Sequence, residues 1–389
     1  GAAQQLTTLA GIPFYSSDNS IYTHNVSGTD STASKNSAYG LASMDAVTTG
    51  DFNSALGYES LSTLNTGSNN SAVGHMALKL NTSGNENNAF GADSLDANTT
   101  GSNNVAMGNG ALGANTTADN NVAIGKGAMI LNTTGAANVA VGYYALGGGS
   151  NNSGSNNTAL GPNAMFGNTT GAGNVAVGNT AMYVNTTGTR NIAIGMNAYN
   201  SSDTENDNLA IGYDAMTTDT AGGQYNVAIG NYALDALTSG DNNVALGYGA
   251  LTDNTTGGKN TATGTSALGN NTTGGENVAV GALSLFTNTT ASYNTAVGTS
   301  ALTDNTTGAS NTGVGRMALY ENTTGSNNTS VGMNSMLDNT TGASNTAIGE
   351  SALGNNTTAD NNTSVGKGSL GTNTTGADNV AVGFTALTA

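Results

Sequence analysis

The ionisable side chains that could do chemistry are few and scattered. The two histidines, His24 and His75, lie far apart with no recurring partner, so neither is expected to act as a general base. Acids on adjacent turns of a β-helix could form the carboxylate pair of a glycosidase. The acids here mostly precede a recurring asparagine, where a solvated turn explains them: Asp119, Glu205, Asp207, Asp241, Glu276 and Asp360. The chain also has no tryptophan to stack on sugar rings, and we expect no enzyme activity.

Metal and cofactor chemistry is equally sparse. Asp-Asn-Asn occurs at 119–121, 241–243 and 360–362, but without an EF-hand loop or a calcium-binding nonapeptide, so turn propensity explains it better than Ca²⁺. The recurring glycines are not followed by a helix pattern, which argues against a phosphate loop or a dinucleotide fingerprint. The chain has no cysteine and therefore no thiolate ligand or disulfide framework. We expect no cofactor and no metal.

One chemical motif does recur, the triplet Asn-Thr-Thr. It matches the acceptor pattern for N-glycosylation, and it also has the composition of a tight turn. Both interpretations stay open at this stage. The candidate glycan acceptors are Asn98, Asn132, Asn185, Asn254, Asn305 and Asn373. An ice-binding surface is less favoured, because adjacent threonines in an extended chain point to different sides.

These motifs recur because most of the chain is one tandem repeat. A glycine, here called the marker glycine, returns every 17 residues from position 40 to position 383, in 21 copies. Three extra residues interrupt the period, two within 147–155 and one within 217–223. Such a period predicts a solenoid, in which each unit contacts mainly its neighbours. The markers include Gly40, Gly57, Gly74, Gly108, Gly142, Gly195, Gly247, Gly298, Gly349 and Gly383.

Aligned on the marker glycine, the repeat reads N-[TVS]-A-[VIL]-G-x-x-A-[LM]-x-x-N-T-T-G-x-x. Seventeen residues are too few for a helix with its return loops, whereas two short strands and two turns fit. We predict an all-β fold, a parallel β-solenoid of about 21 coils. Asn-Thr-Thr-Gly is expected to form one corner, because Asn tolerates unusual backbone angles and Gly accepts positive φ.

An asparagine stands four residues before every marker glycine. Stacked coils lie about 4.8 Å apart. The column therefore predicts a ladder of side-chain amides, each hydrogen-bonded to the copies above and below, with a structural role. The ladder includes Asn36, Asn53, Asn70, Asn104, Asn138, Asn191, Asn243, Asn294, Asn345 and Asn379.

The strand before each marker glycine reads as apolar on both faces, as in residues 192–194 and 227–229. Its alanine suits a narrow coil interior, while the Val/Ile row on the other face would leave a long exposed apolar stripe. We therefore predict a homo-oligomer about a long axis, and favour a trimer. The alternative is a wider monomeric coil that buries both the Val/Ile row and the Leu row.

Charge and the chain ends restrict the partners further. Against 7 basic residues stand 24 acidic ones, a net charge of −17, so nucleic acid is not expected. No apolar run is long enough for membrane insertion. Residues 1–35 lie outside the period and are expected to form a cap or a junction, whereas 36–389 form the repeat shaft. The chain begins without methionine and stops in mid-repeat, which indicates a processed chain or a fragment.

The repeat resembles those of known fibre proteins. N-x-A-[VI]-G-x-x-A is similar to the head repeats of trimeric autotransporter adhesins, and the full unit looks like N-T-A-[VI]-G-x-x-A-L-x-x-N-T-T-G arrays of phage and bacterial tail-fibre-like proteins. The resemblance covers residues 36–389 and implies a left-handed parallel β-roll in an intertwined trimer. Unlike those families, the sequence shows no coiled-coil stalk, no membrane-anchor strands and no C-terminal chaperone.

The resemblance implies a mechanical function. We expect a non-catalytic, extracellular fibre shaft of a bacterial surface adhesin or filament, a stiff spacer between an anchor and a tip that are both outside this chain. Repeated weak contacts along its surface would be made with cell-surface glycans. The alternative is a bacteriophage tail-fibre shaft on the virion, used for host attachment. A polysaccharide-degrading tailspike is a less favoured third possibility.

Overall fold

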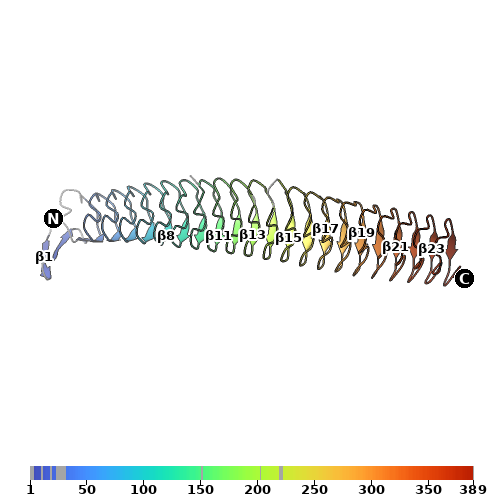
Figure 1. Ribbon diagram of the computed structural model, residues 1–389. Helices are drawn as coiled ribbons and strands as arrows, with labels where there is room; N and C mark the ends of the chain where they lie inside the picture. The colour runs from blue at the N-terminus through green and yellow to red at the C-terminus, as the bar shows by residue number, and fades with distance from the viewer. Residues whose placement is uncertain are drawn as a thin grey trace. The chain divides into compact units, whose positions relative to one another are not determined.

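The computed structural model describes residues 4–9, 12–17, 20–22, 32–149, 152–201, 203–218 and 222–388, with only the backbone described in 4–17. Every regular element in these ranges is a β-strand (Figure 1). No helix that could cross a membrane is found in the described part of the chain. The chain divides into two compact units, Gly1–Asn191 and Ile192–Ala389.

The first unit is a stack of short parallel strands with an antiparallel start. β1 pairs antiparallel with β2, β2 antiparallel with β3, and β3 parallel with β4. From β4 to β12 each three-residue strand pairs in parallel with the next. The strands are β1 Gln4–Leu9, β2 Ile12–Ser17, β3 Ser20–Tyr22, β4 Ser37–Tyr39, β5 Ser54–Leu56, β6 Ser71–Val73, β7 Asn88–Phe90, β8 Val105–Met107, β9 Val122–Ile124, β10 Val139–Val141, β11 Thr158–Leu160 and β12 Val175–Val177.

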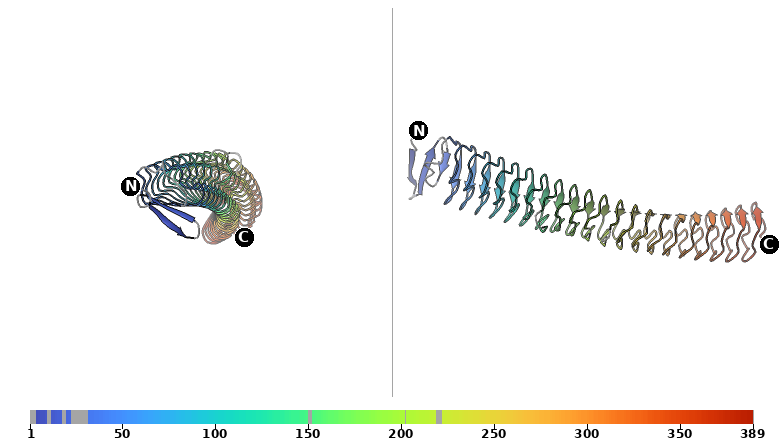
Figure 2. Two further views of the ribbon diagram at one scale, coloured as in Figure 1. Left: turned by 90° about the vertical axis from the view of Figure 1, so that its left-hand side faces the viewer. Right: turned by 90° about the horizontal axis from the view of Figure 1, so that it is seen from above.

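The second unit continues the same design. Its strands also have three residues each and pair in parallel with the next along the chain. Figure 2 shows the strand arrows of the second unit, and those from β4 onward in the first unit, side by side and pointing the same way. The strands are β13 Ile192–Ile194, β14 Leu209–Ile211, β15 Val227–Ile229, β16 Val244–Leu246, β17 Thr261–Thr263, β18 Val278–Val280, β19 Thr295–Val297, β20 Thr312–Val314, β21 Thr329–Val331, β22 Thr346–Ile348, β23 Thr363–Val365 and β24 Val380–Val382.

The strand register follows the sequence period. Thr295 lies opposite Thr312, one 17-residue period away, and the pairing skips the inserted residues, so that Val139 lies opposite Thr158. The prediction of an all-β parallel β-solenoid is confirmed, with about 20 coils at 17-residue spacing where about 21 were expected. Residues 150, 151 and 219–221 of the two insertions lie outside the described part of the chain, as does His24.

The prediction of a second strand in each coil is wrong. After marker Gly298 the backbone makes tight turns in which Ser300 and Leu302 take left-handed φ angles of 57° and 53°. The Ser300 N–H donates to the carbonyl of Ala282 in the preceding coil (2.9 Å), and the Leu302 N–H donates to that of Ala318 in the following coil (3.0 Å). Alternating left-handed residues thus bend the chain around a very small interior while each N–H still reaches a neighbouring coil.

The expected reason for the glycine of Asn-Thr-Thr-Gly is also corrected. Gly308 does not have a positive φ, but a Cβ there would lie 2.3 Å from the carbonyl oxygen of Gly325 in the next coil. Close backbone approach therefore explains this glycine. The marker glycine is required for both reasons, its backbone angle and the close approach of the next coil. Gly298 has a φ of 132°, and a Cβ added there would lie 2.5 Å from the carbonyl oxygen of Gly315.

Small residues fill the interior of each coil. Ala296 on β19 and the pair Ala301 and Leu302 after the marker glycine are fully buried, and the equivalent positions of other coils are alike. Where serine replaces the strand alanine, it is hydrogen-bonded inside the coil: the Ser330 hydroxyl donates to the carbonyl of Ser335 at 2.7 Å. The inward orientation predicted for the strand alanine is therefore present in the structure.

Candidate functional site

The asparagine four residues before each marker glycine is held between coils. Asn294 donates from Nδ2 to the carbonyl of Gly308 (3.0 Å), and its Oδ1 accepts the backbone N–H of Asn311 in the next coil (2.9 Å). The coil-to-coil bond thus runs mainly from backbone to side chain, although some coils add an amide–amide bond, such as Asn70 Nδ2 to Asn53 Oδ1 at 3.0 Å. The amide group of this side chain is therefore used to hold neighbouring coils together.

The same two bonds recur along the column. They are made by Asn36, Asn53, Asn70, Asn104, Asn138, Asn243 and Asn345. At the ends of the units, the Asn191 N–H donates to Asn174 Oδ1 at 2.9 Å, and Asn379 donates to Asn362 Oδ1 at 3.0 Å.

The asparagine of Asn-Thr-Thr forms a second buried column, which the sequence analysis missed. Asn305 donates from Nδ2 to Asn288 Oδ1 of the preceding coil (3.0 Å) and to the carbonyl of Gly308 (2.9 Å). The sequence signal for this buried column was the constant position of the asparagine in the repeat, together with the glycine three residues later. An N-linked glycan would be attached to this same nitrogen.

In the folded coil the nitrogens of this column are buried and hydrogen-bonded, which favours the turn interpretation of Asn-Thr-Thr over glycan attachment. Five of the six candidate acceptors are fully buried, and each donates from Nδ2 to the carbonyl three residues ahead: Asn98, Asn132, Asn185, Asn254 and Asn305. Asn373, in the last coil, is partly exposed, and its Nδ2 donates to Gly376 at 2.9 Å.

A third column lies on the surface, six residues before each marker glycine, and we call it the capping column. A polar side chain there accepts the backbone N–H of the equivalent residue in the preceding coil, as Ser292 Oγ does for Gly275 (3.0 Å). The acids of the three Asp-Asn-Asn motifs have this role, which corrects their interpretation as simply solvated. The bonds are Ser102 N–H to Asp119, Gln224 N–H to Asp241 and Ala343 N–H to Asp360, at 2.7, 2.8 and 2.7 Å.

The remaining ionisable groups lie in small pairs. His75 Nδ1 is 3.3 Å from Asp93 Oδ1, and its ring stacks on Tyr58 at 5.5 Å.

Partial burial raises the pKa of the Asp235 carboxyl above its usual range, with a smaller opposing effect from its hydrogen bond with Thr217. Among the described residues, no group of three His, Cys, Asp or Glu side chains is placed to hold a metal ion.

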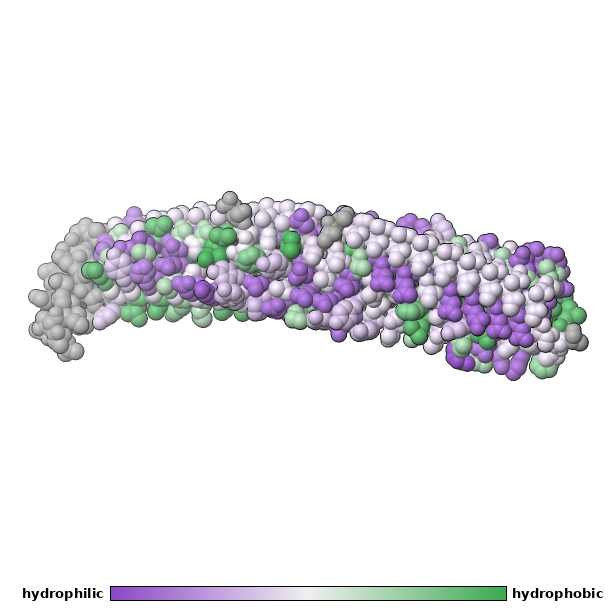
Figure 3. Space-filling view, in the orientation of Figure 1, coloured by the Kyte–Doolittle hydropathy of each residue, from purple (hydrophilic) through white to green (hydrophobic). Residues whose placement is uncertain are grey.

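The outward side of the strands is the main apolar surface. We use the name outer face for the residues one and three positions before each marker glycine. Position one before is apolar in 20 of 21 coils, and side chains such as Leu246, Val297 and Ile348 are 45, 36 and 42% exposed. In the first unit it appears as a hydrophobic margin below the strands (Figure 3). The alternative of a coil that buries this row itself is therefore wrong, since only the Leu column is buried.

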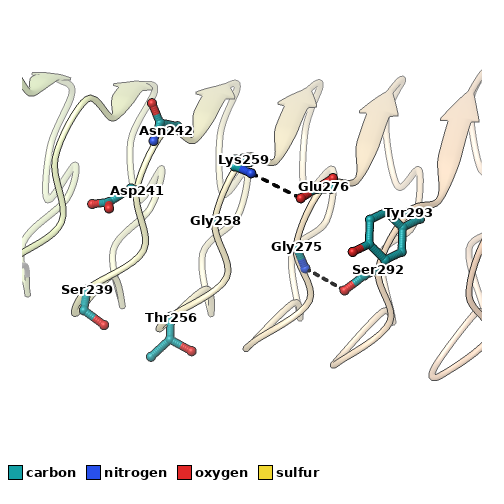
Figure 4. A pocket seen from close by; sticks show the side chains of 10 residues that line it. All are labelled: Ser239, Asp241, Asn242, Thr256, Gly258, Lys259, Gly275, Glu276, Ser292 and Tyr293. Atoms are coloured by element: carbon teal, nitrogen blue, oxygen red, sulfur yellow. Dashed lines mark hydrogen bonds and ion pairs between the residues drawn. The ribbon is translucent and has the colours of Figure 1, made fainter.

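A shallow groove of about 350 Å³ lies on the capping column of the second unit. Gly258 and Gly275 form its floor, with Lys259 and Glu276 along one side (Figure 4). The ammonium of Lys259 and the carboxylate of Glu276 form an ion pair at 3.3 Å. The groove is polar, in contrast to the outer face.

Comparison of the chain with protein-family models, with curated proteins and with solved structures gives no match.

Proposed function

We propose that the chain is the non-catalytic shaft of an extracellular fibre, assembled from three copies that pack outer face to outer face. The main observation behind this proposal is the exposed outer face. It runs from coil to coil within each unit, with an interruption at Thr261 and Thr263, and a monomer would leave it in water, where apolar patches of this extent are unusual. Packing three such faces together removes the stripe from solvent and fits the resemblance to trimeric β-roll fibres.

The two rows of the outer face favour a trimer over a dimer. In a closed ring of three, each copy contacts two different neighbours, so each row can face its own partner. Position three before the marker is less apolar, with Val, Ile or Leu in 10 of 21 coils and Ser, Thr or Asn in the others. The two rows can therefore contribute unequally to the contact between copies.

We also propose that the coil is left-handed, as the resemblance to trimeric β-roll fibres implies.

The internal construction supports a mechanical function. Both asparagine columns and the polar residues of the capping column are used to join one coil to the next. Such a repeat gives stiffness without a bound cofactor. We place the fibre on a bacterial surface, as an adhesin or filament shaft that separates an anchor from a tip.

Immunogold electron microscopy with antibodies against this chain tests the proposal. Intact source cells should be labelled along filaments that project from the surface. Labelling of virion tails instead would favour the tail-fibre alternative, and labelling confined to the cell interior would contradict both. Release of reducing sugar from host polysaccharide by the purified chain would restore the tailspike interpretation.

A further inference from the structure

The groove on the second unit is a break in the capping column. Of the 21 positions that lie six residues before a marker glycine, only 258 and 275 are glycine, and they are consecutive. Elsewhere the position carries a side chain, which is either a polar group that caps the backbone, as Asp241 does for Gln224, or the methyl group of an alanine. Two missing side chains in a row leave the backbone open over the length of two coils.

The break leaves two backbone donors without acceptors. The Gly275 N–H is capped by Ser292 Oγ at 3.0 Å. Within the described part of the chain, the N–H groups of Asp241 and Gly258 make no hydrogen bond, and a Cβ at position 258 or 275 would lie 3.6 or 3.7 Å from the respective nitrogen. Backbone donors of this kind need a partner from solvent or from a ligand.

The walls of the groove carry mixed polar groups and one aromatic ring. Ser239 and Thr256 present hydroxyls on one side, opposite Lys259 and Glu276 (Figure 4). Tyr293 stands at one end, 62% exposed. Free N–H donors, hydroxyls, a carboxylate and an exposed ring together suit a ligand that both donates and accepts hydrogen bonds and has an apolar face.

We propose that this groove binds a neutral saccharide. A sugar hydroxyl can accept a hydrogen bond from the N–H of Asp241 or Gly258 while it donates to Glu276. The C–H face of a sugar ring can pack on Tyr293. The proposal deepens the fibre function by giving the shaft one defined glycan site.

Two other ligand classes fit the groove less well. An anionic ligand would meet the carboxylates of Asp241 and Glu276, in a chain of net charge −17. An extended peptide repeats its same-side carbonyls every 6.8 Å or so, whereas the two free N–H groups are one coil apart, about 4.8 Å.

The test is isothermal titration calorimetry on the whole chain with three probes: cellohexaose, β-1,4-mannohexaose and hexagalacturonate. At least one neutral hexasaccharide should bind. The double variant Gly258→Ser/Gly275→Ser restores the capping side chains at positions where φ is not left-handed, so it should fold normally and weaken binding at least tenfold. Tyr293→Ala should weaken binding at least fivefold.

Matched controls lie on the same columns outside the groove. Ala309→Ser/Ala343→Ser adds two capping serines elsewhere, and Tyr225→Ala removes a ring that is 56% exposed in another coil; both should leave binding unchanged. The proposal is overturned if neither neutral probe binds, if hexagalacturonate binds more tightly than both, or if the Gly258→Ser/Gly275→Ser variant binds like the parent. Any of these results leaves the fibre function itself untouched, since surface labelling and oligomeric mass are measured separately.

Discussion

At the residue scale, each position of the repeat has one physical task, and the marker glycine has the strictest. Gly298→Ala would place a methyl group 2.5 Å from the carbonyl oxygen of Gly315, at a φ of 132° that alanine rarely adopts. We expect a loss of about 3 kcal/mol or more in the free energy of unfolding. Urea unfolding followed by circular dichroism measures it.

Gly308→Ala is the matched control for this prediction. Position 308 has no positive φ, and alanine occupies the equivalent place as Ala118, Ala291 and Ala359. The coil must shift to relieve the 2.3 Å contact with the Gly325 oxygen, but since other coils carry alanine here, the loss should be clearly smaller than for Gly298→Ala. Equal losses for the two variants would contradict the distinction between a glycine required by backbone angle and one preferred for close approach.

The buried asparagine column makes a second prediction at this scale. Asn294→Ala removes the acceptor for the Asn311 N–H and leaves this buried donor unpaired, whereas the Gly308 carbonyl loses one of its two donors and keeps the bond from Asn305. A loss on the order of 3 kcal/mol is expected. Asn361→Ala, which removes an exposed amide 3.1 Å from Asp378, should change stability by less than about 0.5 kcal/mol. A small effect at Asn294 would mean that the column does not hold the coils together.

Asp235 gives a prediction about pH. Burial raises the pKa of its carboxyl in the folded chain, so folding favours the protonated form. Its contribution to stability is therefore present at low pH and is lost as the pH rises through the folded pKa. Asp235→Asn should raise the melting temperature relative to the parent at pH 7 and have little effect at pH 3. A larger gain at pH 3 than at pH 7 would reverse the assigned direction.

At the element scale, the two sides of one strand have opposite tolerances. Ala296 on β19 is fully buried in a narrow interior, whereas its neighbour Val297 lies on the outer face and is 36% exposed. Ala296→Leu should destabilise the coil by about 2 kcal/mol through overpacking. Val297→Leu should be nearly neutral, because Leu160 and Leu246 occupy the same position naturally. Thermal unfolding of both variants distinguishes these outcomes, and equal effects would contradict the inward and outward assignment.

Much of this element could be predicted from the sequence, and the limits have a physical cause. The alternation in residues 295–297 was enough to place a strand and to turn its alanine inward. The turns were not predictable, because Leu302 takes a left-handed φ against its own preference. That conformation is imposed by hydrogen bonds to other coils, 16 or more residues away. The burial of the Asn-Thr-Thr column was missed for the same reason, since the Asn305 amide bonds to Asn288 of the preceding coil.

At the scale of the whole molecule, both units share one unresolved feature, an apolar outer face that the coil cannot bury. The buried columns determine how one chain folds, and the outer face is the basis of the proposed assembly. Covering this face would remove apolar surface from water, and another copy of the chain is always present to do so.

The mass of the purified chain in solution tests this account most directly. One chain has a mass of 38.2 kDa, so three copies give 3 × 38.2, about 115 kDa. Multi-angle light scattering over a tenfold dilution series should return about 115 kDa throughout. A constant mass of about 38 kDa, with the outer face exposed and the chain folded, would contradict the proposed assembly.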